Sequence, residues 1–199
     1  MQRLTWAVSA FVFGLAAAPE YSVPAFAGSV SVAIANFMSI CGHGVADQDS
    51  RVVRFESAGW KQATDAEMTD VARLLEIARS NMGKEITLIS LSSFKRELAG
   101  GTAYAILTDL TASDVSVLGC NIYVPKGDKA EFKQEIVRSI SDKPSKAVDD
   151  AAIGLIFEWS NPSVLPSVIS LRASYLEKGG TTAAILGVSG VALAMTRLK

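Results

Sequence analysis

Residues 85–124 read EITLISLSSFKRELAGGTAYAILTDLTASDVSVLGCNIYV, and this stretch decides the fold. Its apolar residues are largely aliphatic or β-branched and recur with a period of about two, which predicts strands. The breaks between the runs are short and built from turn-forming residues, at 99–101 and 111–114. Links this short favour an antiparallel meander. The three predicted strands cover residues 85–91, 102–110 and 115–124.

On either side of this meander the apolar residues recur every three or four positions, which predicts helices. The clearest helix begins at Thr64, because Thr64 and Glu67 have the spacing of a capping box. Asp47 or Asp49 is the predicted cap of an earlier helix, and Asp128 is the predicted cap of a later one. The predicted helices cover residues 30–41, 47–58, 64–82 and 128–141.

The last part of the chain returns to a strand pattern, with runs at 153–159, 164–175 and 182–195. The final run is also compatible with a helix or a hydrophobic tail. Gly187 and Gly190 disfavour a helix, and the run is shorter than the twenty or so residues of a membrane-spanning helix. We therefore interpret it as a strand.

The N-terminal segment has the features of a cleavable export signal. Arg3 is followed by a charge-free, mostly apolar run at residues 6–18, and the small residues Ala25 and Ala27 fit a signal-peptidase site. We predict cleavage after Ala27 and therefore a periplasmic or secreted protein. A retained hydrophobic helix and a lipoprotein anchored at Cys41 are the alternatives, and both fit the pattern less well.

Cleavage would leave residues 28–199, which are enough for one domain with a proper core. The elements alternate between helical and strand patterns without a long linker or an internal repeat. We predict an α+β fold, with N-terminal helices packed on one antiparallel sheet of five or six strands.

Cys41 and Cys120 are the two cysteines of the chain. In an oxidising compartment they are expected to form a disulfide, which would join the first helix to the third strand. By the chain-entropy relation, a loop of about 80 residues closed in this way stabilises the fold by about 4–5 kcal/mol. The competing hypothesis is a reactive thiol at Cys41, assisted by the nearby His43.

The charges argue against several classes of partner. The whole chain has 19 basic and 20 acidic residues, and removal of the signal segment leaves the balance near zero. No long run of either sign occurs, so we expect neither nucleic-acid binding nor stable membrane insertion. We also predict no cofactor and no metal site, because the lone His43 and Cys41 do not supply the four ligands of a structural zinc site.

Two weak catalytic candidates remain. His43 could act as a general base with Asp47 or Asp49 orienting it. Ser92 and Lys95 have the S-x-x-K spacing of penicillin-interacting enzymes, but the companion motifs of those enzymes are absent. Phosphate-binding loops, dinucleotide-binding motifs, zinc-peptidase motifs and serine-hydrolase elbows are absent as well.

The sequence therefore favours an exported, non-catalytic binding or accessory protein with an unknown protein or small-molecule partner. An exported hydrolase that uses His43 is one alternative, and a small-molecule carrier with an internal cavity is another. Trp60 and Trp159 are expected in the core rather than in a ligand site, because large aromatic side chains contribute so much buried area.

Overall fold

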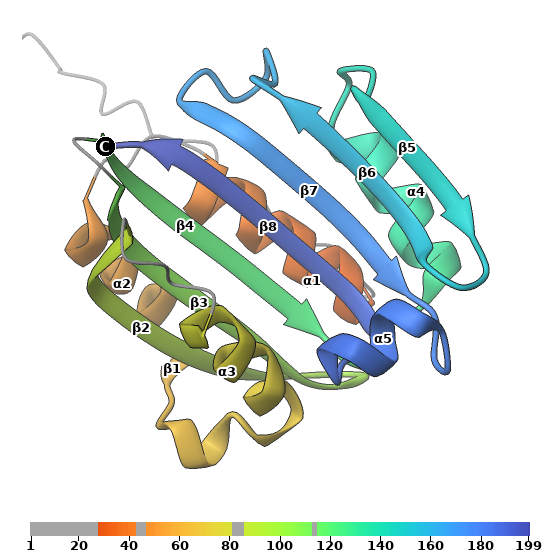
Figure 1. Ribbon diagram of the computed structural model, residues 1–199, viewed down its shortest axis with the longest axis horizontal. Coiled ribbons are helices and arrows are strands. Elements are labelled where there is room, and N and C mark those ends of the chain that lie inside the picture. Colours follow the sequence, from red (N-terminus) through yellow and green to blue (C-terminus); the bar gives the residue numbers. More distant parts are fainter. Residues whose placement is uncertain (1–27, 43–46, 81–85, 113–114) are drawn as a thin grey trace, which may run out of the picture.

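The strands form one antiparallel sheet in the computed structural model, which describes residues 28–42, 47–80, 86–112 and 115–199 (Figure 1). The predicted signal segment therefore lies outside the described residues. Across the sheet the order is β1-β2-β3-β4-β8-β7-β6-β5. The strands are β1 (Lys61–Gln62), β2 (Ile86–Leu98), β3 (Gly101–Ala112), β4 (Val115–Val124), β5 (Lys146–Asp150), β6 (Gly154–Ser160), β7 (Val168–Leu176) and β8 (Gly190–Leu198).

Two meanders meet in the middle of the sheet. Strands β2 to β4 form the first and strands β5 to β8 the second, and β4 pairs antiparallel with β8, so that Cys120 lies opposite Met195. The segment that leaves β4 and the segment that enters β8 consequently lie at the same end of the sheet (Figure 1).

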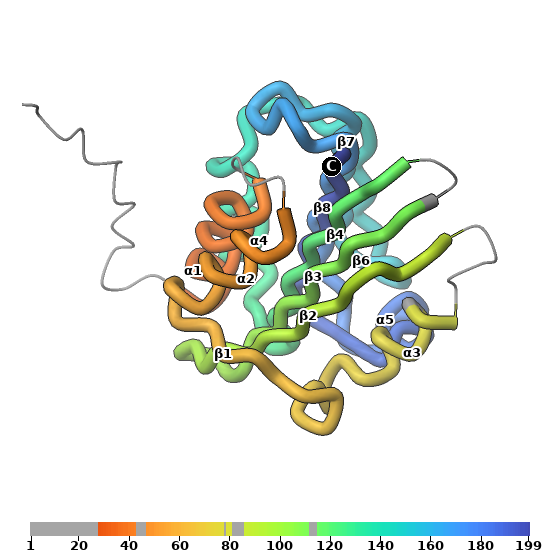
Figure 2. The backbone as a smooth tube through the Cα atoms, turned by 90° about the vertical axis from the view of Figure 1, so that its left-hand side faces the viewer, coloured from red at the N-terminus to blue at the C-terminus, as the bar shows by residue number. Residues whose placement is uncertain are grey.

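One face of the sheet is covered by α1 (Ser29–Asn36), the π-helical segment η1 (Phe37–Gly42), α2 (Gln48–Ser57) and α4 (Lys129–Ser139) (Figure 2). The larger core cluster fills this layer, and both Trp60 and Trp159 are buried in it, as predicted. Phe55 stacks on Phe94 with ring centroids 5.2 Å apart and meets Trp60 edge-on at 5.3 Å. Such pairs add to the stabilisation gained from burial itself.

The opposite face carries α3 (Ala72–Ser80) and α5 (Thr181–Leu186) (Figure 2). Successive strand residues point to opposite faces, so Leu107 of β3 joins the larger cluster while Ile106 joins a second, smaller one. Val71 and Leu75 contribute to this second cluster from the α3 side and Ala183 from α5. Helices thus pack on both faces of the sheet, whereas the sequence predicted a single layer of N-terminal helices.

The predicted helix starts are largely confirmed. The side chain of Asp47 accepts a hydrogen bond from the Ser50 amide at 2.8 Å and begins α2, and Asp128 begins α4 in the same way. The capping box of Thr64 and Glu67 is also present, but it opens a short 3-10 turn rather than a long α-helix. A second 3-10 turn follows, and α3 begins only at Ala72.

The predicted number of strands was wrong, since the sheet has eight strands instead of five or six. The two strands that were not predicted are β5, whose residues KAVDD are mostly charged and exposed, and β1, which is two residues long. Both lie at the edges of the sheet. A short, charged edge strand is held by one neighbour and lacks the apolar alternation that marks a half-buried strand.

The predicted strand at 182–195 was wrong in its first half. Residues Thr181–Leu186 form α5, which ends at Gly187 in the left-handed conformation, with φ 71°. Strand β8 then begins at Gly190. Among the described residues, no helix has the length and apolar character needed to cross a membrane.

The predicted disulfide is confirmed. Cys41 at the end of η1 is bonded to Cys120 in β4, with their Cα atoms 5.9 Å apart. Both cysteines are buried in the larger core cluster. The bond therefore joins the N-terminal helical segment to β4, the last strand of the first meander, and it leaves no free thiol at Cys41.

Candidate functional site

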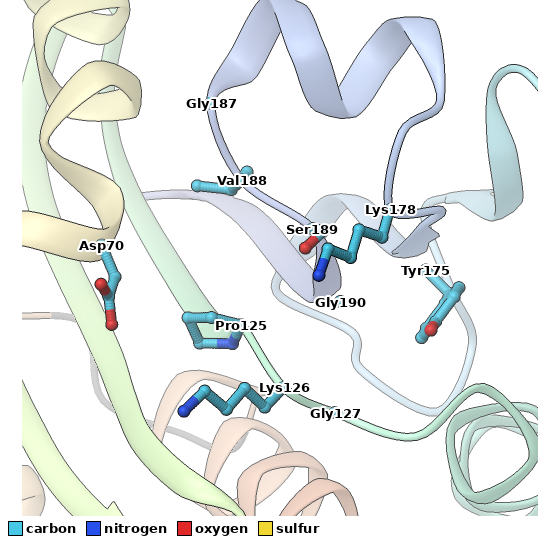
Figure 3. Close-up of a pocket in the computed structure, with 10 residues that line it drawn as sticks. All are labelled: Asp70, Pro125, Lys126, Gly127, Tyr175, Lys178, Gly187, Val188, Ser189 and Gly190. Carbon is cyan, nitrogen blue, oxygen red and sulfur yellow. The ribbon is translucent and has the colours of Figure 1, made fainter.

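A pocket of about 500 Å³ lies at the end of the sheet where β4 finishes and β8 begins. Its walls come from four parts of the chain: the segment after β4, the end of β7 with the β7–α5 connection, the α5–β8 connection with the start of β8, and Asp70 ahead of α3. Figure 3 labels its lining residues. The polar side chains among them are Asp70, Lys126, Tyr175, Lys178 and Ser189.

The floor of the pocket depends on close backbone contact between the two meanders. Gly190 has φ 94°, and a Cβ at this position would lie 2.4 Å from the carbonyl oxygen of Val124. A Cβ on Gly127 would lie 2.8 Å from a methyl group of Val191. Glycine is required at residue 190 both for its conformation and for its closeness to the neighbouring chain.

The charge of the pocket is predominantly positive. Lys126 and Lys178 extend from different segments, and Lys126 passes Pro125 toward the side where Asp70 lies (Figure 3). Neither ammonium group forms an ion pair or hydrogen bond with any residue that the structure describes. Two unpaired lysines in one concave site produce a positive potential that attracts anions.

Asp70 is the one carboxylate of the pocket lining, and it is held by a tyrosine beneath it. The hydroxyl of Tyr104 in β3 donates to Asp70 Oδ2 at 3.1 Å. Burial, together with this hydrogen bond, raises the pKa of Tyr104 above its ordinary value. Tyr104 therefore remains a hydrogen-bond donor at neutral pH and fixes the position of the carboxylate.

A third lysine stands next to the pocket, but its charge is already neutralised. Lys129 pairs with Glu177 and lies 3.8 Å from an oxygen of Asp149. The hydrogen bond to Glu177 raises the pKa of Lys129. Its ammonium also lies 5.9 Å from the centre of the Tyr175 ring, which orients that ring at the pocket wall. The available positive charge therefore belongs to Lys126 and Lys178.

The wall at Gly187 is supported from α3. Arg73 Nε donates to the carbonyl oxygen of Ile185 at 2.7 Å, which ties α3 to the end of α5. The aliphatic part of Arg73 packs against Gly187, where a Cβ would lie 2.8 Å from Arg73 Cδ. This contact holds the α5–β8 connection in place over the smaller core cluster.

The pocket does not have the arrangement of a nucleophile and its base. Ser189 contributes a hydroxyl, but its side chain forms no hydrogen bond within the part of the chain that the structure describes. In the same described part, no group of three or more histidine, cysteine, aspartate or glutamate side chains could hold a metal ion.

The catalytic candidates from the sequence lie elsewhere or are excluded. His43 lies outside the described residues, so the hydrolase hypothesis stays a prediction. Asp47 caps α2: its carboxylate accepts a hydrogen bond from the Ser50 amide, which lowers the pKa of the Asp47 carboxyl. Ser92 and Lys95 both lie in β2, where residues three apart point to opposite faces, so they do not form a nucleophile and base pair.

Sequence reasoning missed the pocket because its residues are far apart in the chain and match no motif. The one sequence feature that could have indicated the pocket is the glycine content of three turns, at 125–127, 178–180 and 187–190. Turns that contain both glycine and lysine can bring backbone amides and ammonium groups to one place, but only the pairing of β4 with β8 brings them together. Comparison with known protein families, curated proteins and solved structures finds no match to the chain.

Proposed function

We propose that the chain is an exported, non-catalytic binding protein whose pocket at the β4–β8 junction takes a small ligand with a carboxylate or phosphate group. The observation that carries the proposal is the pair Lys126 and Lys178, two ammonium groups in one pocket without a partner among the described residues. An anionic group between them would neutralise the excess positive charge.

The size and composition of the pocket fit a small molecule. A volume of about 500 Å³ lies within the range of about 300–1,000 Å³ that is usual for ligand sites. Asp70, held by Tyr104, supplies an acceptor that would bind a hydroxyl or amino group of the same ligand. The ligand class is therefore an anion that also carries a hydrogen-bond donor.

Export is supported by the disulfide and by the predicted signal segment. Disulfides such as Cys41–Cys120 form and persist in oxidising compartments, which include the periplasm and the extracellular space. A periplasmic or secreted location would expose the pocket to small metabolites rather than to cytoplasmic nucleic acids. The carrier hypothesis, which needs an enclosed cavity between helices and sheet, is less well supported than an open pocket at the sheet end.

The test is a thermal-shift screen of small carboxylates and phosphates against three forms of the protein. The wild type is compared with the variant Lys126→Ala/Lys178→Ala and with Lys133→Ala/Lys143→Ala, which loses the same charge at exposed sites away from the pocket. We expect a ligand that stabilises the wild type and the control, with affinity at least tenfold weaker for the pocket variant. Equal affinity in all three forms would overturn the proposal.

A further inference from the structure

A second group of charged residues is buried at the other end of the sheet, where β4 begins and β8 ends (Figure 1). Asp109, Leu118 and Arg197 form one register row across β3, β4 and β8, on the same face as Cys120. Arg197 lies seven residues from the start of β8 at Gly190, which separates this group from the pocket by about 20 Å.

Arg51 reaches this row from α2 and is fully buried. Its Nη1 donates to the carbonyl oxygen of Gly119 at 3.3 Å, and its Nη2 donates to Gln48 Oε1 at 2.9 Å. Because Gly119 follows Leu118 in β4, the guanidinium lies above the row that contains Arg197. We call the group of Gln48, Arg51, Asp109 and Arg197 the arginine cluster.

The arginine cluster contains donors that no described residue accepts. Arg51 Nε, both Nε and Nη1 of Arg197, and Gln48 Nε2 are buried without a hydrogen-bond partner, and one acceptor of the cluster, Asp109 Oδ1, is unpartnered as well. These side chains are at least nine-tenths buried. A buried polar group without a partner is strongly destabilising, and a buried charge more so.

The charges of the cluster do not balance. Asp109 is its one buried carboxylate, and its Oδ2 already accepts from the ammonium of Lys199 at 2.7 Å. Asp109 and Arg197 lie on strands separated by β4, about 10 Å apart along the row. Burial and the neighbouring Arg197 lower the pKa of Arg51 to about 10, and the opposing effects of Asp109 and Asp47 are the smaller ones.

We propose that the arginine cluster binds one small tetrahedral oxyanion, of the phosphate or sulfate class, between Arg51 and Arg197. Nε and Nη1 of Arg197 are both free donors, and either can donate to an oxygen of the anion. Arg51 Nε and Gln48 Nε2 supply donors to the remaining oxygens. The anion offsets the positive charge that Asp109 alone leaves uncompensated.

Lys199 provides the route to the site. Its side chain is 44% exposed, whereas that of Asp109 is 6% exposed, and the two are joined by an ion pair at the surface of the cluster. The backbone amide of Lys199 donates a hydrogen bond to the carbonyl oxygen of Ser116 at 3.0 Å. Because the backbone is held in this way, only the Lys199 side chain must move to admit an anion. The ammonium of Lys199 is the exposed partner of this pair, so its movement uncovers the buried carboxylate of Asp109.

The proposal is tested by thermal unfolding in inorganic phosphate, with chloride at matched ionic strength as the reference. We expect phosphate to raise the melting temperature of the wild type. Arg197→Lys, which keeps the charge but loses the guanidinium donors, should weaken the apparent phosphate affinity at least tenfold. Asp109→Asn removes a competing negative charge and should bind phosphate more tightly, which gives a test even if Arg197→Lys does not fold.

The pocket variant Lys126→Ala/Lys178→Ala distinguishes the two sites, because the part of the phosphate response that depends on Arg197 should persist in it. The proposal is overturned if the wild type shows no specific response to phosphate, if Arg197→Lys or Asp109→Asn responds as the wild type does, or if the pocket variant loses the response. The last of these results would place the phosphate in the pocket, and the others leave the proposed pocket ligand untouched.

Discussion

Val124 and Gly190 approach each other so closely at the junction of the two meanders that a Cβ on residue 190 would lie 2.4 Å from the Val124 carbonyl oxygen. This contact determines where the chain leaves β4 and where it enters β8, and the segments on either side of it line the pocket. The same backbone contact therefore joins the two meanders into one sheet and positions Lys126 near the start of β8.

Gly190→Ala should destabilise the protein by about 2 kcal/mol or more, because the substitution combines a left-handed backbone with a steric clash. Gly179→Ala is the matched control: it also has positive φ, but a Cβ there would meet nothing within 4 Å. The control should cost only about 1 kcal/mol. Urea denaturation measures both values, and equal losses would contradict the proposed role of the contact.

Removal of the disulfide should be costly, because Cys41 and Cys120 are separated by 79 positions in the sequence. We expect Cys41→Ala/Cys120→Ala to lower the free energy of unfolding by about 4–5 kcal/mol. Denaturation of the reduced wild type is the control for the lost side-chain volume and should show a similar loss. A reduced protein as stable as the oxidised one would show that the bond does not stabilise the fold.

Glu131 should act as a cap for a helix other than its own. Its Oε1 accepts from both the amide and the hydroxyl of Ser31, each at 2.8 Å, in the first turn of α1. Glu131→Ala should lower the free energy of unfolding by about 1–2 kcal/mol, and Glu131→Gln, which keeps an acceptor, by less. Lys133→Ala on the exposed side of α4 is the control, and an equal effect of Lys133→Ala would argue against the cap.

The capping box at Thr64 should make stability depend on acid pH. The hydrogen bond from Lys95 at 2.6 Å, assisted by those from Thr64, lowers the pKa of Glu67 from 4.5 to about 2. A depressed carboxyl pKa contributes stability that is present above about pH 4.5 and is lost as the pH falls toward 2.

The difference in unfolding free energy between the wild type and Glu67→Gln should therefore be constant near neutral pH and shrink below pH 4.5. Acid titration of thermal stability measures this difference. Glu76→Gln on the exposed side of α3 should show no such trend. A difference for Glu67→Gln that does not change between pH 5 and pH 2 would exclude the assigned role.

The sequence predicted those parts of the fold that rest on local patterns. The Asp47 and Asp128 caps, the central meander and the Cys41–Cys120 disulfide each depend on residue types at a fixed spacing. The segment at 182–195 was misassigned because its apolar composition fits a strand and a helix equally well. In the structure Ala183 and Leu186 both pack in the smaller core cluster, and their spacing of three places them on one face of a helix.

The candidate sites could not be predicted in the same way. The lysines of the pocket are 52 positions apart in the chain and become neighbours only because β4 pairs with β8. Arg51 and Arg197 come close by the same pairing and by the packing of α2 on the sheet. Lysine and arginine are common residues and most of them are exposed. A sequence does not distinguish the few that form a site, because that depends on which partners the fold brings to them.

Native mass spectrometry of the protein purified from cells tests the central claim most directly, because it reports a ligand retained by the pocket. We predict that the wild type and Lys133→Ala/Lys143→Ala carry an additional anionic species, larger than phosphate or sulfate, that is lost on denaturation. The variant Lys126→Ala/Lys178→Ala should lack this species. The claim is contradicted if the pocket variant retains the same species equally, or if the wild type carries no such species and binds none of the anions in the screen.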